Sequence, residues 1–192
     1  MKPINSSELL SKLKADSLFL LEQIENISNH TPLELLESNN GRGGWNTIQV
    51  LEHLNSYYRY YLPRIERLID DSTPGPDPLF RPGILGNYFT QTMQPKNGRV
   101  ANKMKAMKNH SPSTDLDAKA VITEFLQWQR LLPLLIDRSE KVNLNRIKVP
   151  ISIAPFFKMK LGDVFGFMVA HNNRHWVQIE NLLERYPVLQ PS

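Results

Sequence analysis

The chain has 192 residues, of which 41% are hydrophobic and 22% charged, and this length and composition are typical of one soluble domain with a buried core. It contains no cysteine, which excludes disulfides, thiolate nucleophiles and cysteine-ligated metal centres. There is no run of about 18–20 apolar residues and no apolar signal region in the N-terminal MKPINSSELLSKLK, so we expect a cytoplasmic protein.

The net charge is +4, and the basic residues are concentrated in one segment. Residues 78–114 contain no Asp or Glu, and the basic side chains of the segment 81–108 are Arg81, Lys96, Arg99, Lys103, Lys105 and Lys108. Such a segment could attract an anionic molecule or nucleic acid, or it could be a solvated loop. It is rich in proline, poor in aromatic residues and shows no recognition helix, so nucleic-acid binding is the least favoured of these.

The first part of the chain predicts two long helices. Three-four spacing of buried positions predicts a helix from Ser6 or Ser7 to Asn26. A short helical piece, LELLES, follows Thr31 and Pro32. The second long helix is predicted to begin after Asn46, because Asn46 and Gln49 have the spacing of a capping box. It should continue to Ile69 with a kink caused by Pro63.

The second part predicts a long connection and two more helices. Residues 70–115 are rich in turn-forming residues, with a short helix possible around 102–108. A third helix is predicted from about Asp117 to Ser139 with a kink at Pro133, followed by a loop with a short extended piece. Asp163 is predicted to cap the fourth helix, from Val164 to about Arg185. Long helices with little strand pattern predict an all-α fold, an antiparallel four-helix bundle formed by a single domain of residues 1–192.

Three histidines fall on inward faces of the predicted helices. His171 and His175 are four residues apart in AHNNRHWVQI and therefore share a helix face with apolar residues. His53 lies among apolar and aromatic positions of the second helix. Each could be a core histidine with a satisfied hydrogen bond. Together they could bind one divalent ion and leave positions for water or substrate, as in catalytic rather than structural sites. The remaining histidines, His30 and His110, fall in predicted loops.

Three further residues are candidates for the surroundings of this cluster. Tyr57 lies one turn after His53 and could donate a hydrogen bond in a pocket. Gln178 lies about one turn after His175 and could hydrogen-bond a ligand or water. Asn172 is next to His171 in the sequence and could be partly buried. Each of the three could equally be a packing residue with a satisfied polar group.

The segments WNTIQVLEHL at 45–54 and LGDVFGFMVAHNNRHWVQIENLL at 161–183, with the long connection between them, resemble the DinB-like (YfiT-type) superfamily of four-helix-bundle metalloproteins. This resemblance covers most of the chain. It implies a metal ion bound by His53, His171 and His175, with zinc or nickel as the expected ions. It also implies a possible homodimer, as is common among members.

The resemblance leads us to expect a metal-dependent hydrolase or a transferase that uses a low-molecular-weight thiol, acting on a small electrophilic substrate. Because the chain has no cysteine, the thiol would have to come from a cosubstrate, whose carboxylates the basic segment 81–108 could attract. The alternatives are a non-catalytic, metal-stabilised bundle that binds a small ligand and, less favoured, a protein associated with nucleic acid. No membrane partner is expected.

Overall fold

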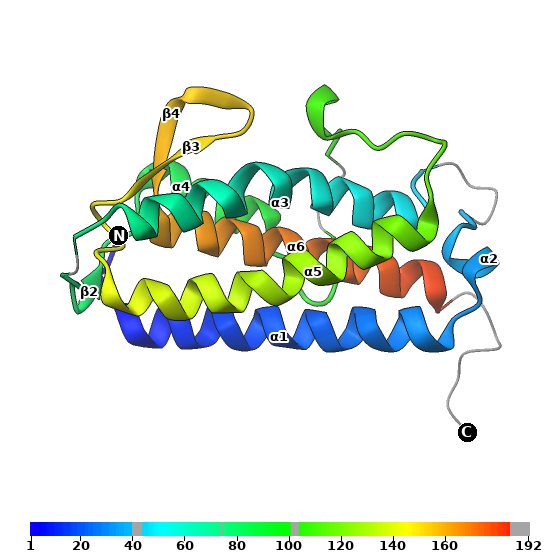
Figure 1. The fold of residues 1–192 in the computed structure, drawn as a ribbon, viewed down its shortest axis with the longest axis horizontal. Coiled ribbons are helices and arrows are strands. Elements are labelled where there is room, and N and C mark those ends of the chain that lie inside the picture. The colour runs from blue at the N-terminus through cyan, green and yellow to red at the C-terminus, as the bar shows by residue number, and fades with distance from the viewer. Residues whose placement is uncertain (40–43, 74, 101–103, 185–192) are drawn as a thin grey trace.

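The protein was analysed as a computed structural model, which describes residues 1–39, 44–73, 75–100 and 104–184. Four long helices form a bundle (Figure 1). They are α1 (Ser6–His30), α3 (Thr47–Asp70), α5 (Ala118–Arg138) and α6 (Leu161–Leu183). Helices α1 and α6 run in one direction and α3 and α5 in the other (Figure 1). Neighbouring contacts join α3 to α5, α5 to α1, α1 to α6 and α6 to α3. The four-helix bundle expected from the sequence is confirmed.

Local sequence explains where the first helices begin. The Asn5 side chain accepts a hydrogen bond from the Glu8 amide, so α1 begins at the predicted place, but it continues to His30, beyond the expected end at Asn26. Helix α2 (Leu33–Leu36) is the short piece expected after Pro32. The capping box of α3 is present, because Asn46 accepts from the Gln49 amide at 2.8 Å and Gln49 accepts from the Asn46 amide at 3.1 Å.

Two prolines lie inside helices without ending them. Helix α3 continues through Pro63 to Asp70, and α5 continues through Pro133 to Arg138. The predicted continuation past each proline is therefore confirmed, while the kinks themselves stay predictions.

The long connection between α3 and α5 contains elements that the sequence did not indicate. Strand β2 (Leu79–Phe80) pairs antiparallel with β1 (Ile4–Asn5), and helix α4 (Ile84–Met93) packs on α6. The helix expected around 102–108 falls partly outside the described residues, and the described part contains only the start of a 3₁₀ turn, η1 (Lys108–His110).

The expected cap of the fourth helix is wrong. Helix α6 begins at Leu161 with Lys160 at the N-cap, directly after the hairpin of β3 (Lys148–Ile151) and β4 (Ala154–Lys160). The Asp163 carboxylate is buried inside the helix and accepts a hydrogen bond from the Gly83 amide, with both oxygens at 3.0–3.1 Å. Asp163 is therefore not the N-cap of α6 but lies in its first turn, where its carboxylate bonds to the Lys160 backbone and also caps the start of α4. The expected end at Arg185 lies outside the described residues.

A chain of buried polar side chains connects all four long helices. Asn172 of α6 donates to the Tyr58 hydroxyl at 2.7 Å, and that hydroxyl donates to the Gln129 side-chain oxygen on α5. Gln129 in turn donates to the Ser17 carbonyl of α1 at 2.7 Å. Because every member is buried and bonded, this chain fixes the relative positions of the helices at little cost in unsatisfied polar groups.

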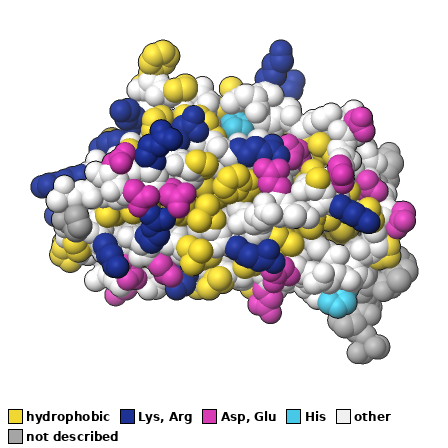
Figure 2. Space-filling view, viewed as in Figure 1, with side chains coloured by type: hydrophobic (Ala, Val, Ile, Leu, Met, Phe, Trp, Pro, Cys, Tyr) yellow, Lys and Arg dark blue, Asp and Glu magenta, His cyan; other side chains and the backbone are white. Residues whose placement is uncertain are grey.

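The outer face of the bundle carries charges of both signs. Figure 2 shows Lys and Arg side chains beside Asp and Glu side chains over α1, α3 and α5. Several of these are ion pairs between helices, including Arg59 with Glu124, Arg130 with Glu25 and Arg138 with Glu66. This face is therefore mixed in charge rather than uniformly basic. Among the described residues, no helix is long and apolar enough to cross a membrane.

Candidate metal centre

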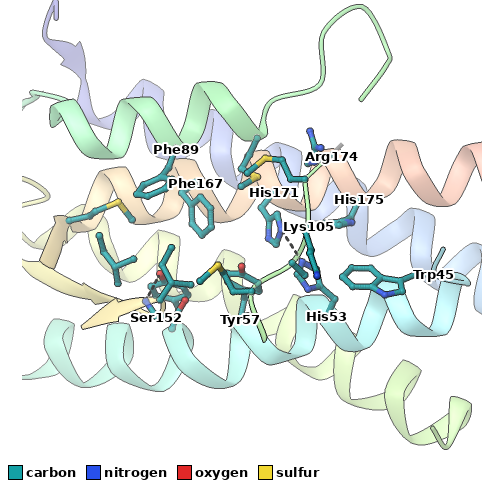
Figure 3. Close-up of a pocket in the computed structure, with 18 residues that line it drawn as sticks. Trp45, His53, Tyr57, Phe89, Lys105, Ser152, Phe167, His171, Arg174 and His175 are labelled. Atoms are coloured by element: carbon teal, nitrogen blue, oxygen red, sulfur yellow. Dashed lines mark hydrogen bonds between the residues drawn. The ribbon is translucent and has the colours of Figure 1, made fainter. Parts of the chain in front are cut away.

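Two helices of the bundle bring three histidines together in its interior (Figure 3). His53 lies on α3, and His171 and His175 lie one turn apart on α6. The Nε2 atom of His171 is 3.2 Å from Nε2 of His53 and 3.1 Å from Nε2 of His175. One possible ligand atom from each residue lies within 4.8 Å of the other two. The three rings that the sequence places on inward helix faces therefore meet at one point.

The outer ring nitrogens fix the protonation of two of these imidazoles. The Nδ1 atom of His53 is 2.7 Å from the His110 carbonyl oxygen, which can only accept, so this Nδ1 carries the proton. The Nδ1 atom of His175 donates to the Gln178 side-chain oxygen at 3.0 Å. Both Nε2 atoms are therefore unprotonated, with lone pairs facing Nε2 of His171. A proton on that atom could satisfy only one of them, whereas a cation would satisfy all three nitrogens.

Burial keeps these imidazoles neutral at physiological pH. Desolvation lowers the pKa of His53, although the hydrogen bond to the His110 carbonyl opposes this effect. Desolvation, aided by the neighbouring imidazoles, lowers the pKa of His171 well below its usual value, and this residue is only 4% exposed. Desolvation also lowers the pKa of His175 to about 3. A neutral imidazole is the form that binds metal, so no proton has to be removed at pH 7.

His110, which the sequence places in a predicted loop, is also part of the site. The 3₁₀ turn buries His110, and its ring stacks on the Tyr57 ring with centroids 3.7 Å apart. The Ser56 hydroxyl donates to the His53 carbonyl at 2.6 Å, so His110 Nδ1 donates to Ser56 at 2.8 Å. His110 Nε2 then accepts from the Ser152 hydroxyl at 2.9 Å. This arrangement holds the carbonyl that orients His53.

A cavity of about 170 Å³ adjoins the histidines and opens toward solvent. It is comparable in size to an engineered cavity of about 150 Å³ that binds benzene. Helices α3, α4 and α6, the β3–β4 hairpin and residues 104–107 all contribute to its walls. Most of the lining is apolar, including Phe89, Met93, Met159 and Phe167. The cavity can therefore hold a small, partly apolar molecule beside the histidine cluster.

The three residues expected around the cluster have different positions. Tyr57 lines the cavity, and burial raises the pKa of its hydroxyl to about 12, so it is a proton donor at neutral pH. Gln178 bonds to His175, as described above. Asn172 instead points into the buried polar chain, where it donates to Tyr58. Adjacent residues on a helix point in directions about 100° apart, so Asn172 is turned away from the cavity that His171 faces.

The chain is similar to a known protein family and to a solved structure. YfiT from Bacillus subtilis, described as a probable metal-dependent hydrolase with an unusual four-helix bundle topology, has 16% sequence identity and a TM-score of 0.48, with 94% of this chain and 86% of that chain covered. No curated protein matches the chain. A family model described as the DinB superfamily matches residues 12–179. Because this match covers most of its length, the chain belongs to the DinB superfamily.

Proposed function

We propose that His53, His171 and His175 bind one divalent metal ion and that the chain is a metal-dependent enzyme acting on a small electrophilic molecule. The observation that carries this proposal is the pair of fixed Nε2 lone pairs on His53 and His175, both directed at His171. Repulsion between such lone pairs in a buried site is relieved most directly by a cation.

The spacing of the nitrogens supports the same proposal. An ion bound at about 2.0–2.1 Å with tetrahedral angles separates neighbouring nitrogen ligands by roughly 3.3–3.4 Å. The observed separations of 3.2 and 3.1 Å differ from this by a few tenths of an ångström. Three imidazoles suit zinc, nickel, copper or iron. Zinc and nickel are our candidates because of the resemblance to DinB-like metalloproteins.

An ion held by three histidines would act as a Lewis acid, polarising an electrophile and lowering the pKa of an attacking water or thiol. The residues that line the cavity would contribute to binding and to catalysis in two different ways. The apolar walls around Phe89 and Phe167 would hold the substrate body and exclude water. The protonated Tyr57 hydroxyl could donate a hydrogen bond to an oxygen that gains negative charge during the reaction.

The nucleophile in this proposal is either water or a low-molecular-weight thiol. Water would make the protein a hydrolase, and a thiol would make it a transferase. The chain has no cysteine, so a thiol would be a cosubstrate that enters the cavity with the electrophile. Neither alternative needs a further protein nucleophile.

A direct experiment combines metal loading with a reaction screen. Metal-free protein would be reloaded with zinc or nickel and mixed with small esters, epoxides and aryl halides, with and without added thiols. We expect product formation above that of a His171→Ala protein treated identically. Dependence on thiol would identify the transferase, and activity without thiol the hydrolase. A loaded protein that binds ligands in the cavity but converts none would favour the non-catalytic alternative.

We also propose that the protein forms a homodimer, because of the resemblance to DinB-like proteins. From its composition we propose a cytoplasmic location. Light scattering coupled to size-exclusion chromatography would measure the mass in solution. A monomeric mass at micromolar concentration would contradict the dimer. Fractionation of cells producing the protein would test its location.

A further inference from the structure

His110 is hydrogen-bonded to two separate elements of the structure through its backbone and its ring. Its carbonyl oxygen accepts from Nδ1 of His53 on α3 at 2.7 Å. Its Nδ1 donates to the Ser56 hydroxyl on α3 at 2.8 Å, and its Nε2 accepts from the hydroxyl of Ser152, in the turn between β3 and β4, at 2.9 Å. Because both ring nitrogens are bonded and the residue is only 3% exposed, turning the ring or shifting η1 would break a buried hydrogen bond.

Ser152, which bonds to the His110 ring, is itself fastened to α3. Its backbone amide donates to the Tyr61 hydroxyl at 3.1 Å, and Tyr61 is buried in the bundle. The turn of the β3–β4 hairpin is therefore held at a defined place over α3, one residue after the end of β3 at Ile151. The ring of His110 is clamped between this turn and the helix that carries His53.

The same ring also fixes the orientation of Tyr57. The two rings stack with their centroids 3.7 Å apart and their planes 16° apart. Tyr57 in turn meets His53 and His171 edge-on, at centroid distances of 5.1 and 4.7 Å (Figure 3). A stacked partner on one face of an aromatic ring restricts the tilt of that ring. His110 therefore contacts both a residue of the histidine cluster and the tyrosine beside it.

We propose that His110 is a positioning residue, which holds His53 in the orientation that binds the metal and Tyr57 in the orientation that presents its hydroxyl to the substrate. Ser152 shares this role because it fixes the His110 ring. The inference rests on the proposed function, since it takes His53 as a metal ligand and Tyr57 as a hydrogen-bond donor. Substitution cannot remove the carbonyl that accepts from His53, but it can change the ring that keeps this carbonyl in place.

Nuclear magnetic resonance of metal-free protein tests the orientation of both residues. Imidazole nitrogen shifts distinguish a ring protonated at Nδ1 from one protonated at Nε2. We expect wild-type His53 to be protonated at Nδ1 only, as its bond to the carbonyl requires. His110→Phe keeps a ring beside Tyr57 but loses both ring hydrogen bonds, so His53 should become a mixture of the two forms. His110→Ala also removes the stacked ring, and the Overhauser contacts between Tyr57 and His171 should be lost.

Metal affinity is the second readout. Co²⁺ would be used because its visible absorption depends on the number and arrangement of its ligands, and its affinity would be measured in competition with a chelator. His110→Phe should weaken Co²⁺ binding by about 10- to 100-fold, the usual effect of removing the partner of a metal-binding histidine. Ser152→Ala should weaken it in the same direction and by less. Ser152→Thr keeps the hydroxyl and should restore both the affinity and the absorption spectrum.

A matched control separates positioning from a general loss of stability. Ser139, in η2 (Ser139–Lys141), is a buried serine whose hydroxyl donates to the Leu135 carbonyl at 2.7 Å. Ser139→Ala should lower the urea midpoint as Ser152→Ala does, because each loses one buried hydrogen bond, but it should leave Co²⁺ affinity unchanged. Circular dichroism would confirm that each variant is folded.

Two results would overturn the inference. One is wild-type Co²⁺ affinity and a single His53 form in folded His110→Phe and Ser152→Ala, whose lower stability would then show that these residues only fasten the connection to the bundle. The other is persistence of the Tyr57–His171 contacts in His110→Ala. Failure of the proposed function looks different: wild-type protein would bind no Co²⁺, while the spectra of metal-free protein would still report whether His110 orients His53 and Tyr57.

Discussion

The Nδ1 atoms of His53 and His175 each donate a hydrogen bond, and these two bonds decide where the Nε2 lone pairs point. Partners of this kind commonly change metal affinity by about 10- to 100-fold when they are removed. For His53 the partner is a backbone carbonyl, which substitution cannot delete. For His175 it is the Gln178 side chain, which can be changed directly.

Replacing Gln178 with alanine should therefore weaken metal binding by about 10- to 100-fold without unfolding the bundle. Gln178→Glu should restore or exceed wild-type affinity, since a carboxylate accepts the same hydrogen bond. Competition with a chromogenic chelator would measure both affinities. Asn172→Ala is the matched control on the same helix, expected to lower stability by roughly 1–3 kcal/mol through the Tyr58 contact but to leave affinity unchanged. Equal affinity of Gln178→Ala and wild type would show that Gln178 does not orient His175.

Replacing His171 with alanine should remove metal binding altogether. His171 lies between the other two rings, so its loss leaves two separated nitrogens that water readily displaces from a divalent ion. The helices should remain, because the core consists of apolar residues on four helices, such as Leu54, Phe125 and Ile179. Mass spectrometry would measure metal content and far-ultraviolet circular dichroism the helices. Stoichiometric metal in the variant would refute the three-histidine site, and outright unfolding would argue for a structural ion.

The positions of these residues were predictable from sequence to different degrees. His53, His171 and His175 could be placed on inward faces because helical periodicity alone fixes the direction of their side chains. His110 could not, because it sits in a short turn without periodicity and reaches the site through contacts with residues far away in the sequence. For Asn172 the sequence left a place beside the cluster and a packing role both open, because one position on a helix separates the cavity from the core.

At the scale of elements, helix α4 depends on one close contact. An added Cβ at Gly86 would lie 2.2 Å from the Asp163 Cβ, so only glycine lets α4 pack against α6 at this point. Helix α4 in turn supplies Phe89 and Met93 to the cavity. The glycine therefore couples the position of α4 to the shape of the proposed substrate site.

Gly86→Ala should consequently destabilise the protein by about 1–3 kcal/mol, as overpacking of a tight contact usually does. Gly75→Ala is the control, since nothing lies within 4 Å of an added Cβ there. Urea denaturation would measure both changes. A stability of Gly86→Ala within about 0.5 kcal/mol of wild type would show that α4 can shift without cost, and the cavity lining would have to be reconsidered.

The elements that the sequence predicted correctly are those defined by local chemistry. Asn46 and Gln49 form the cap of α3 from residues three apart, and Asp117 caps α5 in the same way through the Ala120 amide. Helix α4 was missed because exposed apolar residues such as Ile84, 87% exposed, break its amphipathic pattern. The strands β1 and β2 are two residues each and exist through pairing of distant segments, which no local pattern encodes.

At the scale of the whole molecule, burial of several neutral histidines makes stability depend on pH. Desolvation lowers the pKa of His110 to about 4 and of His175 to about 3, and it also lowers the pKa of His53 and His171. The unfolded chain, with pKa values near 6.5, therefore binds more protons than the folded one as the pH falls. The stabilising contribution is complete above about pH 6.5 and is lost below it.

Metal-free protein should thus lose up to about 1.4 kcal/mol per buried histidine for each pH unit below 6.5. Urea denaturation at intervals from pH 7.5 to 5 would measure this loss of stability. Ordinary carboxylates have pKa values near 4 and stay largely ionised over this pH range. Asp163, whose pKa is raised by burial, would act with the opposite sign and offset part of the loss. His171→Ala should show a shallower dependence than wild type. A flat profile from pH 7 to 5 would contradict the buried neutral state of the cluster.

X-ray absorption spectroscopy of the zinc-reconstituted protein, with the metal content of the same sample, tests the proposed centre most directly. The account predicts one ion per chain with three imidazole nitrogens at about 2.0–2.1 Å, and no bound ion when His53, His171 and His175 are all replaced by alanine. An ion coordinated by fewer than three imidazoles, or zinc retained stoichiometrically by the triple variant, would contradict it.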